Sequence, residues 1–267
     1  MLCDTTFAAG FANGSGRSSS LESSIKIRNL PRHGHGRILR IGHRGAAGHA
    51  PENTIASIRK GISLGVDFVE LDVRSTRDGR LVLMHDALVD RTTDGTGPVS
   101  EMTWDELQLL DAGNGELVPC VEDALAAANG HAGAILEAKT TGIGPALQRV
   151  VRASAFTGEA IYASFLHEEI LEIRKLDPFA RTMALMECVP VSGASLACDA
   201  NATLVGLSLN CATAEFIAVL HDAGLEVLLY TVNDSRVIQC AIEFGADGVI
   251  SDYPERIPKI RPNSASS

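Results

Sequence analysis

The feature of this sequence that most constrains its fold is a repeated switch between short β-branched runs and stretches of helical periodicity. This switch is the pattern of successive βα units. Eight strand-like runs occur, at residues 38–43, 68–74, 133–139, 160–165, 181–186, 203–209, 226–232 and 247–251. Eight such units match a closed parallel barrel, and 267 residues suit a single barrel domain. We therefore predict an α/β fold of the (β/α)8 type.

The two ends of the chain differ from this pattern. Residues 1–37 are rich in Ser, Gly and Arg and lack periodicity, so we expect a flexible N-terminal leader. Residues 257–267 contain two prolines and several serines, and we expect a C-terminal tail there. The predicted barrel domain covers residues 38–256.

Local signals place further elements within the domain. Pro51-Glu52 predicts the start of a helix with proline in its first turn, and Gly65 its end. The dipeptide Asp78-Gly79 favours a hairpin turn, which leads into an extra short strand at residues 81–85. Residues 86–118 hold too many turn residues for a barrel helix alone. We predict a small insertion there, with a short helix near residues 104–110.

Charge and composition limit the partners of this chain. The formal net charge is −10 and the pI is about 5.3, so the chain lacks the basic surplus that displaces counterions from nucleic acid. No apolar run approaches the roughly 20 residues that span a bilayer, and no secretory signal is evident. We expect a soluble cytoplasmic protein without an integral membrane segment. Its six cysteines form no CxxC pair, and we expect reduced, mostly buried thiols rather than a zinc or redox site.

Carboxylates gather at the ends of two predicted strands. Strand alternation places Glu70 and Asp72 on the inward face, and Glu137 and Lys139 share a face of the next barrel strand. Buried like charges raise a pKa or recruit a cation, and oxygen ligands of this kind suit Mg²⁺ or Ca²⁺. The alternative is a set of ion pairs that serves stability alone.

Two histidines end their own apolar runs. His43 follows the first strand, where barrel enzymes place catalytic groups, and the adjacent Arg44 could reach an anion. His85 ends the run of residues 81–85 and could face the same mouth. Two histidines beside a metal-bound anion would supply a general base and a general acid.

Taken in order, five motifs resemble those of the glycerophosphodiester phosphodiesterase family. They are His43-Arg44-Gly45, Pro51-Glu-Asn-Thr54, Glu70-Leu-Asp72, Met84-His-Asp86 and Glu137-Ala-Lys139. The resemblance extends from about Arg40 to Pro254 and includes the closing segments Tyr230-Thr-Val-Asn233 and Gly245-Ala-Asp-Gly-Val-Ile-Ser-Asp-Tyr-Pro254.

The resemblance implies a TIM barrel that hydrolyses glycerophosphodiesters, such as glycerophosphocholine and glycerophosphoethanolamine, to sn-glycerol 3-phosphate and an alcohol. One divalent cation, Mg²⁺ or Ca²⁺ with Mn²⁺ as a further candidate, would be held by Glu70, Asp72 and Glu137. His43 would be the general base and His85 the general acid. In the mechanism usually proposed for the family, a glycerol hydroxyl attacks phosphorus and the cyclic phosphate is then hydrolysed.

The remaining implied roles concern substrate binding. Arg44 and Lys139 would hold the phosphate, while Glu52 and Asn53 would shape the mouth and the glycerol pocket. This chain departs from the family pattern at Tyr230, where tryptophan is usual, and between Glu137 and Lys139, where alanine replaces a bulkier residue. Tyr230 keeps an aromatic wall and adds a hydroxyl, which bears on substrate preference more than on catalysis.

Two alternatives stay open at this point. The same groups would serve a lysophospholipase D or a phosphoinositide-type phosphodiesterase, and an apolar rim near the insertion would favour a lipid substrate. A catalytically silent barrel that binds a phosphorylated ligand or partner is the other, because a fold alone never establishes a function. The expected partner is a small glycerophosphodiester, and a homodimer is left open.

Overall fold

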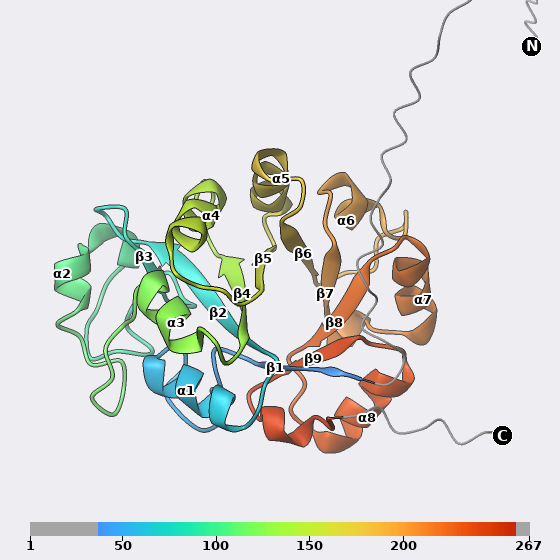
Figure 1. The fold of residues 1–267 in the computed structure, drawn as a ribbon, viewed down its shortest axis with the longest axis horizontal. Coiled ribbons are helices and arrows are strands. Elements are labelled where there is room, and N and C mark those ends of the chain that lie inside the picture. The colour runs from blue at the N-terminus through green and yellow to red at the C-terminus, as the bar shows by residue number, and fades with distance from the viewer. Residues whose placement is uncertain (1–36, 260–267) are drawn as a thin grey trace, which may run out of the picture. The chain divides into compact units, whose positions relative to one another are not determined.

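A computed structural model describes residues 37–259 of the protein (Figure 1). The expected leader, residues 1–37, and the expected tail, residues 257–267, lie outside the described residues except at their inner ends. Those inner ends are Arg37 and residues 257–259.

Eight parallel strands close into a barrel, which confirms the fold predicted from the sequence. Around the barrel they are β1 (Leu39–Gly42), β2 (Phe68–Ser75), β4 (Gly133–Ala138), β5 (Ala160–Ser164), β6 (Arg181–Met186), β7 (Leu204–Ser208), β8 (Glu226–Tyr230) and β9 (Gly248–Ser251). Closure occurs at β1, which pairs with β2 on one side and β9 on the other. Parallel pairing places the carboxyl ends of all eight strands at one end of the barrel.

Seven helices connect these strands and surround the barrel (Figure 1). They are α1 (Ile55–Ser63), α3 (Val121–Ala128), α4 (Gly144–Ala153), α5 (His167–Leu176), α6 (Ser195–Asp199), α7 (Ala214–Asp222) and α8 (Ser235–Glu243). Short 3₁₀ turns, η2 (Leu209–Cys211) and η3 (Pro254–Arg256), follow β7 and β9. Within residues 37–259, no helix combines the length and the apolar character needed to cross a membrane.

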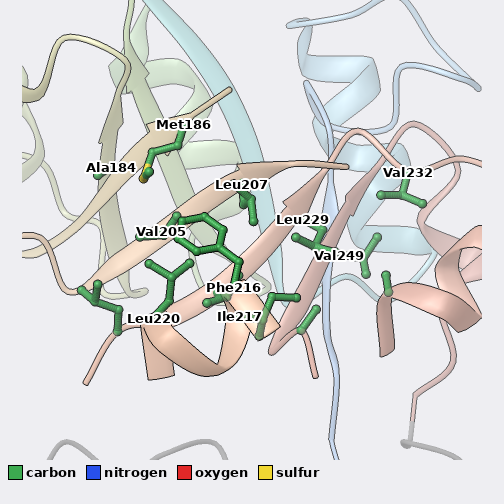
Figure 2. Close-up of a cluster of buried hydrophobic side chains, with 14 of the residues drawn as sticks. Ala184, Met186, Val205, Leu207, Phe216, Ile217, Leu220, Leu229, Val232 and Val249 are labelled. Atoms are coloured by element: carbon green, nitrogen blue, oxygen red, sulfur yellow. The ribbon is translucent and has the colours of Figure 1, made fainter. Parts of the chain in front are cut away.

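Alternation along the strands divides the core into an inner and an outer layer. The inner cluster consists of Leu39, Ile41, Phe68, Ile135, Ile161, Ala163, Met183, Leu185, Leu204, Leu228 and Ile250. The outer layer packs strands against helices. Figure 2 shows part of it, where Phe216, Ile217 and Leu220 of α7 lie against Val205 and Leu207 of β7. Burial of such side chains stabilises the fold by about 1.5–3 kcal/mol each.

The first helix begins later than the sequence predicted. Residues 51–54 form a turn, and α1 begins at Ile55, because Asn53 has a left-handed φ of 58° that a helix cannot accommodate. Thr54 is the N-cap and accepts a hydrogen bond from the Ser57 amide. The predicted end of the helix is confirmed, since Gly65 adopts a φ of 77° directly after the last turn.

The segment of residues 84–120 leaves the barrel between β3 (Leu81–Leu83) and α3. β3 pairs antiparallel with β2, and it is followed by a 3₁₀ turn, η1 (Val99–Glu101), and a one-turn helix, α2 (Trp104–Leu107). A capping box between Thr103 and Glu106 fixes the start of α2. Apolar side chains of the segment pack with Val82 of β3 in a small core of their own, to which the segment contributes Met84, Val89, Val99, Leu107, Ala112 and Val118.

The expectation that the cysteines are mostly buried is wrong. Among the five described cysteines, only Cys120 is buried, whereas Cys188, Cys198 and Cys240 are exposed. Cys188 lies in the loop after β6, and Cys240 lies on the solvent face of α8, where helical periodicity places it outside the core. All five are free thiols.

Candidate active site

Three carboxylates converge at the C-terminal ends of β2 and β4. Glu70 and Asp72 point inward from β2 while Val69, Leu71 and Val73 pack against the helices. The strand register pairs Asp72 with Glu137 of β4. Each of the three carboxylates is buried and offers one oxygen within 4.8 Å of the others.

The electrostatics of these carboxylates favour a bound cation. Burial and the neighbouring Asp72 raise the pKa of Glu70 from 4.5 to about 8, and the same two causes raise the pKa of Glu137. Three converging hard oxygen donors are the ligand set that Mg²⁺ and Ca²⁺ prefer. The residues present therefore fit a divalent cation.

Two basic side chains lie against the same carboxylates. Lys139 Nζ is 2.7 Å from Glu137 Oε1 and 3.4 Å from Asp72 Oδ1, and Arg44 Nε is 3.2 Å from Asp72 Oδ2. Burial acts to raise the pKa of Asp72, but Arg44 and Lys139 outweigh burial and the pKa is lowered. The ion pairs considered from the sequence alone therefore coexist with the carboxylate cluster.

The loop between β1 and α1 folds over the carboxylates with unusual backbone angles. Arg44 and Gly45 have φ values of 50° and 91°, and the Arg44 amide donates to Glu70 Oε2 at 3.0 Å. Asn53, also in the left-handed region, donates from Nδ2 to Asp72 Oδ2 at 2.8 Å and accepts from the Asp72 amide. Non-glycine residues with such angles cluster at functional sites. Asn53 thus lies buried against a candidate metal ligand, and together with Glu52 and His85 it also lines a small second cavity.

His43 is held on its far side by a carboxylate that directly follows the last strand. Its Nδ1 is 2.6 Å from Asp252 Oδ1, and its Nε2 is 3.9 Å from Glu70 Oε2. Asn233 donates from Nδ2 to the other Asp252 oxygen at 2.6 Å. Burial acts to lower the pKa of His43, but Asp252 and Glu70 outweigh burial and raise it. The hydrogen bond to Asp252 assigns the proton to Nδ1, which leaves Nε2 facing the carboxylates.

The second histidine, His85, also has a carboxylate partner, which belongs to the next residue in the sequence, Asp86. His85 Nδ1 is 2.7 Å from Asp86 Oδ1, and the Met84 amide donates to the Asp72 carbonyl at 3.0 Å, which holds this segment beside β2. Burial is the main cause that lowers the pKa of His85. His85 and His43 thus reach the site from different elements.

An apolar wall completes the cavity beside the carboxylates. Its lining residues are His43, Glu70, Glu137, Ala163, Phe165, Met183, Leu185, Tyr230 and Ile250. The rings of Phe165 and Tyr230 meet edge to face at 6.0 Å, and Lys139 Nζ lies 6.0 Å from the Phe165 ring centre. Tyr230 donates its hydroxyl to the Met186 carbonyl, so its ring rather than its hydroxyl faces the cavity.

The structure brings together most of the residues singled out in the sequence, although their roles stay predictions. Glu52 joins the same network through Arg44 Nη1 at 2.7 Å. The sequence analysis did not single out two residues of the candidate site, Asp252, which contacts His43, and Phe165, which lines the cavity. Asp252 could have been found, because it directly follows β9 at the catalytic end of the barrel, whereas Phe165 carries no motif.

Comparisons with known proteins agree on one family. The Glycerophosphoryl diester phosphodiesterase family matches residues 43–256. The glycerophosphodiester phosphodiesterase of Bacillus subtilis (strain 168) is 30% identical over an alignment of 254 residues, and the match covers 84% of this chain and 87% of that protein. The enzyme of that name from Caldanaerobacter subterraneus subsp. tengcongensis is 31% identical over 235 residues, covering 82% and 96% respectively.

Solved structures give the same result. An Oleispira antarctica phosphodiesterase, in complex with the product sn-glycerol-3-phosphate, superposes with a TM-score of 0.79 at 27% identity, covering 83% of this chain and 95% of that one. The glycerophosphodiester phosphodiesterase of Agrobacterium tumefaciens superposes with a TM-score of 0.72 at 30% identity, covering 82% and 99%.

Proposed function

The chain belongs to the glycerophosphoryl diester phosphodiesterase family, and on that premise we propose that it hydrolyses glycerophosphodiesters to sn-glycerol 3-phosphate and an alcohol. Glycerophosphocholine and glycerophosphoethanolamine are the proposed substrates. The observation that carries this proposal is the convergence of three carboxylates, two basic side chains and His43 at the C-terminal end of the barrel strands.

Glu70, Asp72 and Glu137 would hold one divalent cation, Mg²⁺, Ca²⁺ or Mn²⁺. When bound, the ion neutralises charge on a non-bridging phosphate oxygen. Arg44 and Lys139 lie against these carboxylates and have donors free to turn toward a phosphate. Asn53 and Glu52 would act through their neighbours, Asn53 by fixing Asp72 and Glu52 by fixing Arg44.

The proposed proton transfers use both histidines. His43 Nε2 would remove a proton from the attacking hydroxyl, and Asp252 at Nδ1 would stabilise the imidazolium that results. Protonated His85 would give its Nε2 proton to the leaving alkoxide, while Nδ1 keeps its own proton and donates it to Asp86. Phe165 and Tyr230 would exclude water from one side of the substrate.

The first experiment is an assay of chelator-stripped protein on glycerophosphocholine and glycerophosphoethanolamine. Mg²⁺, Ca²⁺ or Mn²⁺ is restored separately, and glycerol 3-phosphate is detected with a coupled dehydrogenase. We expect release that depends on the added metal. Release without any added metal would contradict the proposed dependence on a divalent cation. No release from either diester would contradict the proposed substrate class. Lysophospholipids assayed in parallel distinguish a lipid-directed enzyme from a barrel that only binds.

His43→Ala tests the assignment of the base. We expect turnover to fall by about 10²–10⁴-fold, since this is the usual contribution of a positioned acid or base. Metal binding, measured by calorimetry, should be retained because His43 is not among the proposed ligands. Unchanged turnover would overturn the role of His43.

A further inference from the structure

Arg91 is a half-exposed arginine on the segment after β3, and it makes three charge-assisted hydrogen bonds. Its Nε donates to Asp86 Oδ2 at 2.6 Å. Its two terminal nitrogens donate to the two oxygens of Glu52, at 2.7 Å for Nη2 and 2.9 Å for Nη1. Exposed ion pairs usually contribute little, but a bidentate contact within a charged network is the exception.

The two carboxylates on either side of Arg91 each reach the active site. Asp86 uses its other oxygen to hold His85 Nδ1 at 2.7 Å. Glu52 accepts from Arg44 at 2.7 Å, and Arg44 in turn contacts Asp72 at 3.2 Å. A single guanidinium therefore connects the proposed acid with the candidate phosphate and metal residues.

The orientation of His85 depends on a short chain of contacts. Asp86 lies on a loop, and its carboxylate is about one-third exposed, so without a second partner it could turn toward solvent and release the imidazole. Arg91 prevents this because its planar fork is already held by both oxygens of Glu52. The Arg91 hydrogen bond is also the largest cause that lowers the pKa of Asp86, which keeps that carboxylate an acceptor.

We propose that Arg91 is a positioning residue that fixes Asp86 so that protonated His85 presents its Nε2–H to the leaving oxygen. As the bond between phosphorus and that oxygen breaks, the oxygen keeps the bonding pair and takes the proton from His85. This inference rests on the proposed function, in which His85 is the general acid.

Arg91 is not needed to fasten the segment to the barrel. Glu116 accepts from the Ala56 amide at 2.9 Å, and Arg77 donates to the Glu101 carbonyl at 2.8 Å. The small apolar core of the segment also includes Val82 of β3. Loss of Arg91 should therefore disturb the histidine more than the fold.

Two esters with different leaving groups test the proposal. Choline leaves as an alkoxide and needs the proton, whereas p-nitrophenolate, from the p-nitrophenyl ester of glycerol 3-phosphate, leaves without one. For Arg91→Met we expect kcat on glycerophosphocholine to fall roughly 10- to 100-fold, a part of what a positioned acid contributes, and kcat on the aryl ester to change less than about threefold. Arg91→Lys should recover part of the loss, because its point charge attracts Asp86 without the fork.

The matched control is Arg77→Met, which removes another exposed arginine that contacts the same segment away from His85. We expect it to leave both esters unchanged. Equal losses on both esters in Arg91→Met would overturn the positioning role and indicate a structural one. So would no loss on either ester.

His85→Ala separates this inference from the proposed function. If His85→Ala slows only the choline ester and Arg91→Met slows neither ester, the positioning role of Arg91 is wrong and the assignment of His85 as the acid stands. If His85→Ala slows both esters equally, the acid assignment itself is wrong, and the inference is overturned with it.

Discussion

The two histidines of the candidate site differ in what holds them. Asp252 binds His43, and Asn233 holds Asp252 in turn, both through Nδ2 and by accepting from the Asp252 amide at 2.9 Å. The partner of His85 is a more exposed carboxylate on a loop. Each histidine is therefore held by a carboxylate that a second side chain fixes, Asn233 for the partner of His43 and Arg91 for the partner of His85.

Replacing the carboxylate behind His43 should impair turnover without unfolding the protein. For Asp252→Asn we expect kcat to fall by about 100-fold or more, because an amide does not stabilise the imidazolium or enforce its tautomer as a carboxylate does. Steady-state kinetics on the same diester measure the effect. The control is Asp234→Asn, a change at the exposed N-cap of α8, whose kcat should stay within about twofold of that of the parent protein. If kcat of Asp252→Asn equals that of the parent, Asp252 does not support the function of His43.

At the scale of elements, the loop between β1 and α1 shapes the site through its backbone. Gly45 adopts a φ of 91° and donates to the Glu70 carbonyl at 3.2 Å, which brings the Arg44 amide onto the Glu70 side chain. A Cβ at Gly45 would lie 2.4 Å from Ser57 Oγ and 2.7 Å from the Ile58 nitrogen. Helix α1 thus packs on the loop without room for a side chain.

Gly45→Ala should therefore be strongly destabilising, by about 2–4 kcal/mol in urea unfolding, from backbone strain together with steric overlap. Gly79→Ala is the matched control, because Gly79 has a φ of 83° but no atom within 4 Å of the added Cβ. It should cost only the strain, about 1–2 kcal/mol. Equal losses in the free energy of unfolding for the two variants would mean that the close approach of α1 to Gly45 does not contribute to the effect.

For the whole molecule, a buried cluster of like charges makes stability depend on pH and on metal. Below pH 4.5, Glu70 is protonated in both the folded and the unfolded chain. Between pH 4.5 and about 8, the folded metal-free protein retains a proton that the unfolded chain has lost. Stability from this group is therefore present at low pH and is lost as pH rises toward 8.

We expect the free energy of unfolding in chelator to fall from pH 5 to pH 8, as measured by urea denaturation. Added Mg²⁺ or Ca²⁺ should restore it increasingly as pH rises, since the ion binds the deprotonated carboxylate and releases a proton. Calorimetry in buffers of different ionisation enthalpy counts that proton. In Glu70→Gln the proton release should be lost, and unchanged release would assign it to another group.

The sequence alone determined the elements and much of the chemistry of this protein. Eight alternating units indicated the closed barrel, because period-2 and period-3.6 patterns are local properties of the chain. Alternation in β2 correctly placed Glu70 and Asp72 on the inward face. The late start of α1 was missed, since the left-handed turn at Asn53 depends on its hydrogen bonds to Asp72.

Only the tertiary structure decided which side chains meet. Asp252 lies 209 positions from His43, and Arg91 lies 39 positions from Glu52, so no local pattern could pair them. Barrel closure between β1 and β9 brings the first pair together, and packing of the segment after β3 brings the second. Hydrogen bonds and ion pairs act over a few ångströms in space and do not depend on separation along the chain. Their partners are therefore fixed by the closed barrel and not by the motifs that supply the residues.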